Sequence, residues 1–176
     1  WSEAESTIDA ELICNGTEYI FKNNHKIIDY FNDRFKKIFE NHLNKKFVVV
    51  TLCWAYYIPD IILKTIQESD SNVFFLIRFH PSTSQDERNE VLIKLSSLSN
   101  KNFEVEHSTD LPLYTLFLNA SVHLAIVSTA ILEGLKFGIK TIAIGTRAKA
   151  YYSDADDQNL LLFMDKSSDI VSEIKK

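Results

Sequence analysis

Short apolar runs that alternate with helical segments constrain the fold of this chain more than any other feature. Most are rich in Val, Ile, Leu and Phe, as expected for strands covered on both faces of a sheet. The six runs are Phe47–Cys53, Val73–Phe79, Phe103–Glu106, Val122–Val127, Lys140–Ile144 and Leu160–Met164. Because helical crossovers connect parallel strands, the sequence predicts an α/β fold: a single Rossmann-like open parallel sheet of about six strands, with helices on both faces.

Helices are expected between these runs, where Pro59, the segment Ser82–Ser84 and Pro112 stand at helix-start positions. The predicted helices are Asp60–Glu68, Gln85–Leu98, Leu113–Leu118, Ile131–Phe137 and Ser167–Ile174. Gly134 and Gly138 would let one helix pack close to the sheet, with Gly138 just past its end. Residues 145–157 are predicted to form a polar loop that carries Arg147 and Lys149.

The segment before the first run is predicted to be an amphipathic helix over about Asn24–Leu43. Its apolar positions recur at helical spacing: Ile27, Ile28, Phe31, Phe35, Ile38, Phe39 and Leu43. This face either belongs to the core or covers something absent from the chain. The predicted organisation is therefore a linker and packing helix over residues 1–45, followed by a Rossmann-like domain over residues 46–176.

Length, charge and composition exclude several classes of function. The 176 residues suit one domain, and a formal net charge of −5 argues against a nucleic-acid partner. The two cysteines form no disulfide framework, and no Cys/His spacing fits zinc, so no metal is expected. No apolar run is long enough to cross a bilayer, which favours a cytoplasmic location. The first residue is Trp, which suggests a processed chain or a fragment.

Three loops are expected to converge where a ligand would bind. If the strand order is 3-2-1-4-5-6, it reverses between the first and fourth strands, and ligands bind beyond the carboxyl ends of strands at such a point. The loops there are residues 54–58, His80-Pro81 and Ser128-Thr129. Backbone N–H groups, hydroxyls and a helix start at Ser128-Thr129 favour a phosphate. Alternatively, Ser128 or Thr129 only caps the helix, and His80 is held by its own loop.

Two charged residues beside these loops have open roles. Arg78, inside an apolar strand, needs a partner: a carboxylate such as Asp110 or Glu106, or a ligand phosphate. Glu133 could accept hydrogen bonds from ribose hydroxyls or pair with Lys136. The glycine-rich dinucleotide fingerprint and the Walker motif are both absent, so a pyrophosphate cradled by glycines is not expected.

These residues resemble the nucleotide-binding half of a GT-B glycosyltransferase. Arg78-Phe79-His80-Pro81, followed by Ser128-Thr129 and then Glu133-Gly134, is similar to the His-Pro and Ser-Ser or Ser-Thr motifs of bacterial sialyltransferases, capsule transferases and glycerophosphate polymerases. Thr129 stands where Ser is commoner, and Arg78 where Lys is frequent. The resemblance implies that His80 and Ser128-Thr129 hold the phosphate of a CMP- or CDP-activated donor, with Glu133 on the ribose.

The resemblance implies a metal-independent glycosyltransferase, or the donor-binding half of one, in bacterial capsule or lipopolysaccharide synthesis. The nucleotide-sugar donor would be a substrate, with no cofactor. His80, assisted by Arg78, Arg147 or Lys149, would stabilise the departing phosphate. The acceptor glycan would bind a second domain that this chain lacks, and peripheral membrane association is compatible with that role. The alternatives are a nucleotide-sugar epimerase or hydrolase, and a non-catalytic α/β module that binds a partner through its aromatic N-terminal helix.

Overall fold

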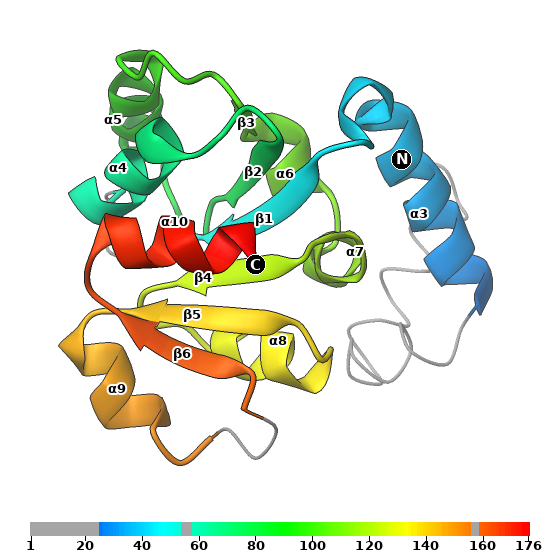
Figure 1. Ribbon diagram of the computed structural model, residues 1–176. Helices are drawn as coiled ribbons and strands as arrows, with labels where there is room; N and C mark the ends of the chain where they lie inside the picture. Colours follow the sequence, from blue (N-terminus) through cyan, green and yellow to red (C-terminus); the bar gives the residue numbers. More distant parts are fainter. Residues whose placement is uncertain (1–24, 54–57, 156–158) are drawn as a thin grey trace.

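The computed structural model describes residues 25–53, 58–155 and 159–176, which form one parallel sheet with helices on both faces (Figure 1). Its strands are β1 (Lys46–Thr51), β2 (Val73–Arg78), β3 (Phe103–Glu104), β4 (Val122–Ala125), β5 (Lys140–Ile144) and β6 (Leu161–Met164). They lie in the order β3-β2-β1-β4-β5-β6, and each neighbouring pair is parallel. The α/β prediction and the predicted strand order are both confirmed.

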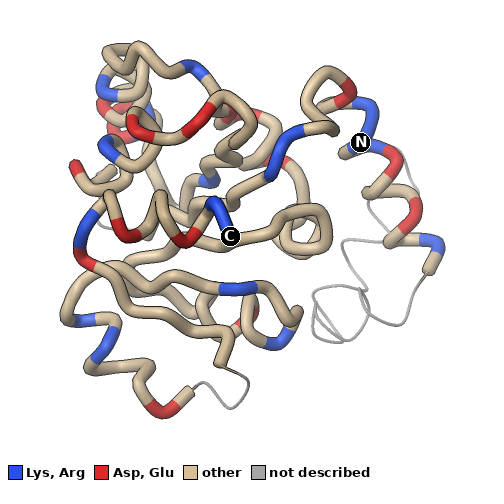
Figure 2. The backbone as a smooth tube through the Cα atoms, in the orientation of Figure 1, with Lys and Arg blue, Asp and Glu red and all other residues tan. Residues whose placement is uncertain are grey.

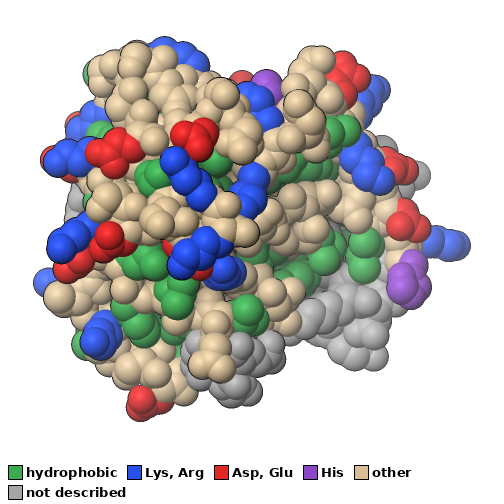
Figure 3. Space-filling model, in the orientation of Figure 1, with side chains coloured by type: hydrophobic (Ala, Val, Ile, Leu, Met, Phe, Trp, Pro, Cys, Tyr) green, Lys and Arg blue, Asp and Glu red, His purple; other side chains and the backbone are tan. Residues whose placement is uncertain are grey.

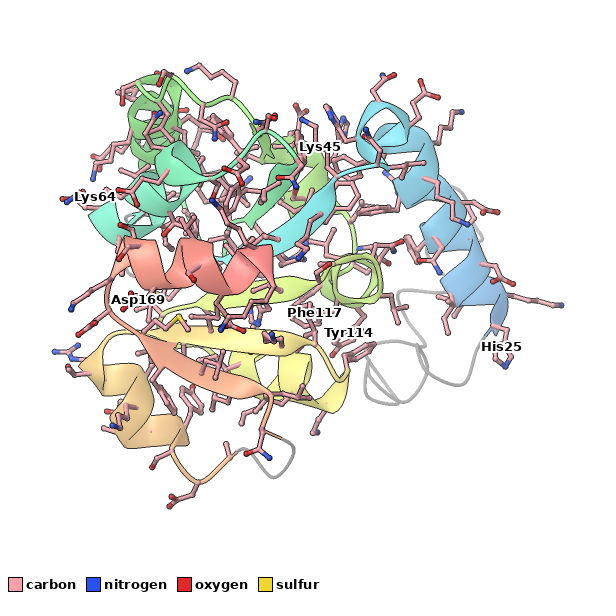
Figure 4. The ribbon with its side chains drawn as sticks, viewed as in Figure 1. His25, Lys45, Lys64, Tyr114, Phe117 and Asp169 are labelled. Carbon is pink, nitrogen blue, oxygen red and sulfur yellow. The ribbon has the colours of Figure 1, made fainter. Side chains whose placement is uncertain are left out.

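Helices cover the two faces of the sheet in two groups. The helices are α3 (His25–Ile38), α4 (Asp60–Glu68), α5 (Gln85–Ser96), α6 (Glu106–Asp110), α7 (Leu113–Asn119), α8 (Ala130–Lys136), α9 (Thr146–Tyr152) and α10 (Ser167–Lys175). We call the face under α4, α5 and α10 the first face; Figure 4 labels Lys64 on α4 and Asp169 on α10 there. The opposite face, under α3, α7 and α8, is the second face.

Side chains along each strand alternate between the two faces of the sheet. In β1, Val48 and Val50 pack into the first-face cluster, whereas Val49 packs into the second-face cluster. All three are fully buried, as a central parallel strand requires. The unbroken apolar run that predicted β1 is therefore explained by the presence of helices on both sides.

The aromatic face of α3 is part of the core. Its side chains pack on the second face, where the rings of Phe35 and Phe47 lie 5.2 Å apart in an edge-to-face contact. Asn119 of α7 donates a hydrogen bond of 2.9 Å to Asn32 of α3. The apolar stripe of this helix is therefore covered by the sheet and by α7. Leu43, at its predicted end, lies beyond a short 3-10 turn (Glu40–His42) and is exposed.

Two segments differ from the sequence prediction. Residues 106–110 form the short helix α6 because the Glu104 carboxylate accepts hydrogen bonds from the backbone N–H groups of His107 and Ser108, which cap the helix start. Within the predicted loop 145–157, Thr146–Tyr152 is the helix α9, which the fully buried Ala148 anchors against the sheet. The fourth strand also ends earlier than predicted, at Ala125.

Helix α8 lies close to the sheet because Gly134 has no side chain. A Cβ at Gly134 would lie 2.8 Å from Thr141 Oγ1 and 3.0 Å from His123 Nδ1. Gly138 ends the helix with a φ of +72°, a conformation that glycine adopts without strain. Tyr114 of α7 stacks on Phe137 at the end of α8, with ring centroids 4.7 Å apart (Figure 4). The predicted close approach is confirmed at Gly134, whereas a Cβ at Gly138 would meet nothing within 4 Å, so Gly138 serves only to end the helix.

A buried polar group lies beneath α8. His123 is fully buried, and its Nε2 lies 2.9 Å from Thr51 Oγ1, while its Nδ1 lies 3.4 Å from Thr141 Oγ1. Burial lowers the pKa of His123 to about 3. The imidazole is therefore neutral in the fold, and its two ring nitrogens join the central strands β1, β4 and β5 through hydroxyl groups.

We expect Gly134→Ala to destabilise the protein by about 1–3 kcal/mol, because the added methyl group forces the buried Thr141 and His123 side chains to move. Urea unfolding measures the loss. Leu132→Ala, at an exposed position of the same helix, should change stability by less than about 0.5 kcal/mol. Equal stability of Gly134→Ala and the parent protein would contradict the close packing.

The free energy of unfolding should fall by about 2 kcal/mol between pH 7 and pH 5 on account of His123 alone. The unfolded histidine, with a pKa of 6.5, binds protons in this window, whereas the folded one, with a pKa of about 3, does not. The pH-dependent loss should therefore be smaller by that amount in His123→Leu. His107→Leu, at an exposed position, is the control; identical pH profiles for His123→Leu and the parent would show that the imidazole titrates normally.

Candidate functional site

The strand order reverses at β1, and the predicted site residues follow its two neighbours. Thr51, at the end of β1, pairs in register with Arg78 of β2 and with Ala125 of β4. His80 follows Arg78 by two residues, and Ser128 follows Ala125 by three. Because adjacent strands lie about 4.8 Å apart, the β2 and β4 backbones are about 10 Å apart here. Of the third predicted loop, residues 54–58, the part 54–57 lies outside the described residues, and Ile58 is fully buried.

Arg78 is held by the end of helix α6. Its Nη1 donates hydrogen bonds to the carbonyls of Ser108, at 2.9 Å, and Thr109, at 2.8 Å, and also to that of Leu111. These backbone carbonyls, rather than the carboxylate of Asp110 or Glu106, are its direct partners among the described residues. The second and third donor groups, Nε and Nη2, make no hydrogen bond within the described part of the chain. Arg78 is thus oriented by one nitrogen and keeps donors for a ligand.

The charged groups near Arg78 come from both sides of β1, where the strand order reverses. Burial lowers the pKa of Arg78, while the nearby carboxylates of Asp110 and Glu133 raise it. Glu133 belongs to the first turn of α8, whereas Arg78 ends β2. The start of α8 and the end of β2 therefore lie within electrostatic range of each other, across the end of β1.

The imidazole of His80 is oriented by its own loop. Its Nδ1 accepts a hydrogen bond of 3.2 Å from the Ser82 backbone N–H and lies 2.7 Å from Ser82 Oγ. A ring nitrogen that accepts from an N–H carries no proton, so the neutral imidazole is protonated on Nε2. His80 is half-buried, and Nε2 forms no hydrogen bond with the described residues. The loop thus fixes the ring and presents an N–H donor.

The two hydroxyl residues before α8, Ser128 and Thr129, differ in their contacts. Ser128 Oγ accepts a hydrogen bond of 3.2 Å from the Ala130 N–H, as the capping alternative expects. Thr129 is exposed, and its side chain makes no capping hydrogen bond. Glu133 is half-buried one turn further along the helix. The hydroxyl of Thr129 is therefore the more accessible of the two.

A cleft of about 640 Å³ opens beside these loops. The residues that line it come from α3, from the end of β2, from α5 and from α6: Arg34, Arg78, Phe79, Pro81, Arg88, Thr109 and Asp110. Of the residues predicted for the ligand site, Arg78 and Pro81 line this cleft, and His80, Ser128, Thr129 and Glu133 do not. Arg34 and Arg88 were missed because each stands among polar residues of a helix, where no motif marks it.

Other predicted contributors lie further from the reversal point. Arg147 and Lys149 are exposed on α9, after β5; Figure 2 shows the basic positions of this helix. Within the described residues, no group of three or more His, Cys, Asp or Glu side chains could hold a metal ion. None of the described helices combines the length and apolar character needed to span a bilayer.

Comparison with known proteins finds a similar fold in a wall teichoic acid polymerase. No known family profile and no curated protein sequence matches the chain. A solved structure of the wall teichoic acid polymerase TagF, in a histidine-to-asparagine variant soaked with CDPG, matches 94% of the chain at 15% identity and a TM-score of 0.55. A longer soak of the same variant matches 84% at 16% identity and a TM-score of 0.50. The chain spans 38% and 37% of these two proteins.

At these identities the likeness concerns the fold. The chain shares the Rossmann-like α/β fold of the matched part of TagF.

Replacing Arg78 by Met should destabilise the protein by about 2–4 kcal/mol, because three backbone carbonyls at the end of α6 lose a charged donor. Urea unfolding provides the measurement. Arg147→Met, at an exposed position, should shift stability by less than about 0.5 kcal/mol. If both variants were equally stable, Arg78 would have no part in holding α6.

Proposed function

We propose that this chain is the donor-binding half of a glycosyltransferase that uses a nucleotide-activated sugar, CMP- or CDP-linked, in bacterial surface polysaccharide synthesis. The observation that carries the proposal is the reversal of strand order at β1, which sets the loop of His80 and the start of α8 on either side of one strand end. Ligands of open α/β sheets bind at such a point. The fold shared with TagF, which was soaked with CDPG, supports the same class of donor.

In this proposal the donor phosphate lies between the two loops. The Thr129 hydroxyl and the backbone N–H groups at Ser128-Thr129 bind its oxygens, and His80 donates from Nε2. Glu133 accepts hydrogen bonds from the ribose hydroxyls. Pro81 holds the turn after His80. As the glycosidic bond breaks, negative charge grows on the nucleotide phosphate, and these donors stabilise it more than they stabilise the bound substrate.

The rest of the transferase reaction needs groups beyond this site. A carboxylate of an acceptor-binding domain would deprotonate the acceptor hydroxyl, which attacks the anomeric carbon of the donor. No metal and no cofactor takes part in the proposed reaction, and Arg147 or Lys149 adds positive charge near the phosphate. We propose residues 46–176 as the donor-binding domain and residues 1–45 as the linker and packing helix. The proposed location is cytoplasmic, at the membrane periphery.

One alternative loses support from the packing of α3. A non-catalytic module was expected to bind its partner through the aromatic face of the N-terminal helix. Phe31, Phe35 and Phe39 on that face are at most 8% exposed, so the helix uses it within the protein. A nucleotide-sugar epimerase or hydrolase differs from the transferase in needing no acceptor, so activity on a nucleotide sugar alone would distinguish it.

Titration calorimetry with CMP, CDP, UDP and GDP tests the proposal. We expect CMP or CDP to bind the chain more tightly than UDP or GDP. His80→Ala and Thr129→Ala should each weaken that binding about tenfold or more, because each removes a polar group from the proposed phosphate position.

Two matched variants serve as controls for this titration. His107→Ala changes an exposed histidine on α6, and Ser121→Ala changes an exposed serine before β4, at the opposite end of that strand. Neither should change nucleotide affinity more than twofold. A folded protein that binds none of the four nucleotides would refute the donor-binding proposal.

A further inference from the structure

The cleft beside β2 concentrates the arginines of the chain. The sequence contains four arginines among its 19 basic residues, and three of them, Arg34, Arg78 and Arg88, line this one cleft. They come from three separate elements, α3, β2 and α5. Asp110 is the one acidic residue that lines it. In a chain of net charge −5, this is a local excess of positive charge.

Two of the three guanidinium groups are held in place. Arg78 is fixed by the carbonyls at the end of α6. Arg88 donates from Nε to the Thr83 carbonyl at 3.3 Å, and its guanidinium lies over the Phe79 ring, 5.4 Å from the centroid. In the described part of the chain, the remaining N–H groups of both arginines form no hydrogen bond. Fixed guanidinium groups with spare donors suit the paired oxygens of phosphate and carboxylate.

The positive charge of the cleft is local. On the face drawn in Figure 3, Lys and Arg side chains are interspersed with Asp and Glu, with apolar side chains between them. Such a mixed surface gives little long-range attraction to anions. Any selectivity for an anion would therefore arise inside the cleft, whose volume of about 640 Å³ is within the range of small-molecule sites.

We infer that this arginine cleft is a second anion site, separate from the donor phosphate position, and that it binds a phosphate or carboxylate group of the acceptor. Arg78 and Pro81 line it, whereas His80, Ser128, Thr129 and Glu133 do not, so its occupant would use other side chains than those assigned to the donor phosphate and ribose. It lies on the β2 side of β1, next to Pro81. The assignment to an acceptor rests on the proposed function, whereas anion binding by the cleft does not.

Three sugars that differ in one group provide the probes: glucose 6-phosphate, glucuronic acid and glucose. We expect calorimetry on the 176-residue chain to detect binding of one or both anionic sugars, with or without saturating CMP. Glucose should show no binding. Arg34→Gln and Arg88→Gln should each weaken binding of the anionic sugar about tenfold, because each removes one charged donor pair. Whether the phosphate or the carboxylate sugar binds more tightly identifies the group that the cleft prefers.

The variants avoid Arg78 because its replacement also releases α6. Lys36→Gln on α3 and Lys94→Gln on α5 remove one exposed positive charge from the same two helices and should leave affinity within twofold. Circular dichroism and urea unfolding confirm that all four variants are folded.

Any of four results would overturn the inference, and the first three concern the anionic sugars. They are no binding of either anionic sugar, binding that both arginine variants leave unchanged, and binding that saturating CMP abolishes. Weaker binding of CDP, but not of CMP, in Arg34→Gln and Arg88→Gln would also overturn it, because the cleft would then hold a second phosphate of the donor. If no nucleotide binds while the anionic sugars bind through Arg34 and Arg88, the donor proposal fails and the anion site stands.

Discussion

The pairing of β1 with both β2 and β4 is the constraint on which the rest of the structure depends. All the crossovers before β4 build the sheet toward β3, and the crossover into β4 returns to the other side of β1. Strand β1 therefore has a neighbour on each side and is buried on both faces, which explains its nearly continuous apolar sequence. The same reversal leaves the ends of β2 and β4 separated by one strand, so that the loops following them lie on either side of the end of β1.

Two contacts on the second face, one buried and one part-buried, hold the elements around the end of β1. Gly134 lets α8 rest on His123 and Thr141, which fixes the height of the helix start above the sheet. Arg78 binds the carbonyls at the end of α6 and so connects β2 to the segment that follows β3. Both contacts are structural, yet they set the positions of Thr129, Glu133 and the arginine cleft. The framework thereby orients groups that lie within reach of a ligand.

Much of the fold could be predicted from sequence because its signals are local and repeated. The apolar runs located the strands, Pro59 and the segment 82–84 marked helix starts, and Gly138 marked a helix end. Helix α6 was missed because it is capped by Glu104, a residue assigned to the preceding strand. Helix α9 was missed because its polar residues predicted a loop, whereas a single buried alanine, Ala148, anchors it as a helix.

The candidate site was harder to predict than the fold. Motif residues such as His80 and Ser128 stand out because they follow strands directly. Arg34 and Arg88 do not, since their approach to Arg78 exists only after three elements have packed together. The direct partners of Arg78 could not be predicted either, because they are backbone carbonyls, which every residue has and no residue type marks.

The central claim is that the loops after β2 and β4 form one ligand site, and amide chemical-shift mapping of the isotope-labelled chain during a CDP titration tests it directly. We expect the amide signals of His80, Ser82 and residues 128–131 to shift together, with one shared dissociation constant. Shifts confined to one of these two loops, or shifts with different dissociation constants, would contradict it.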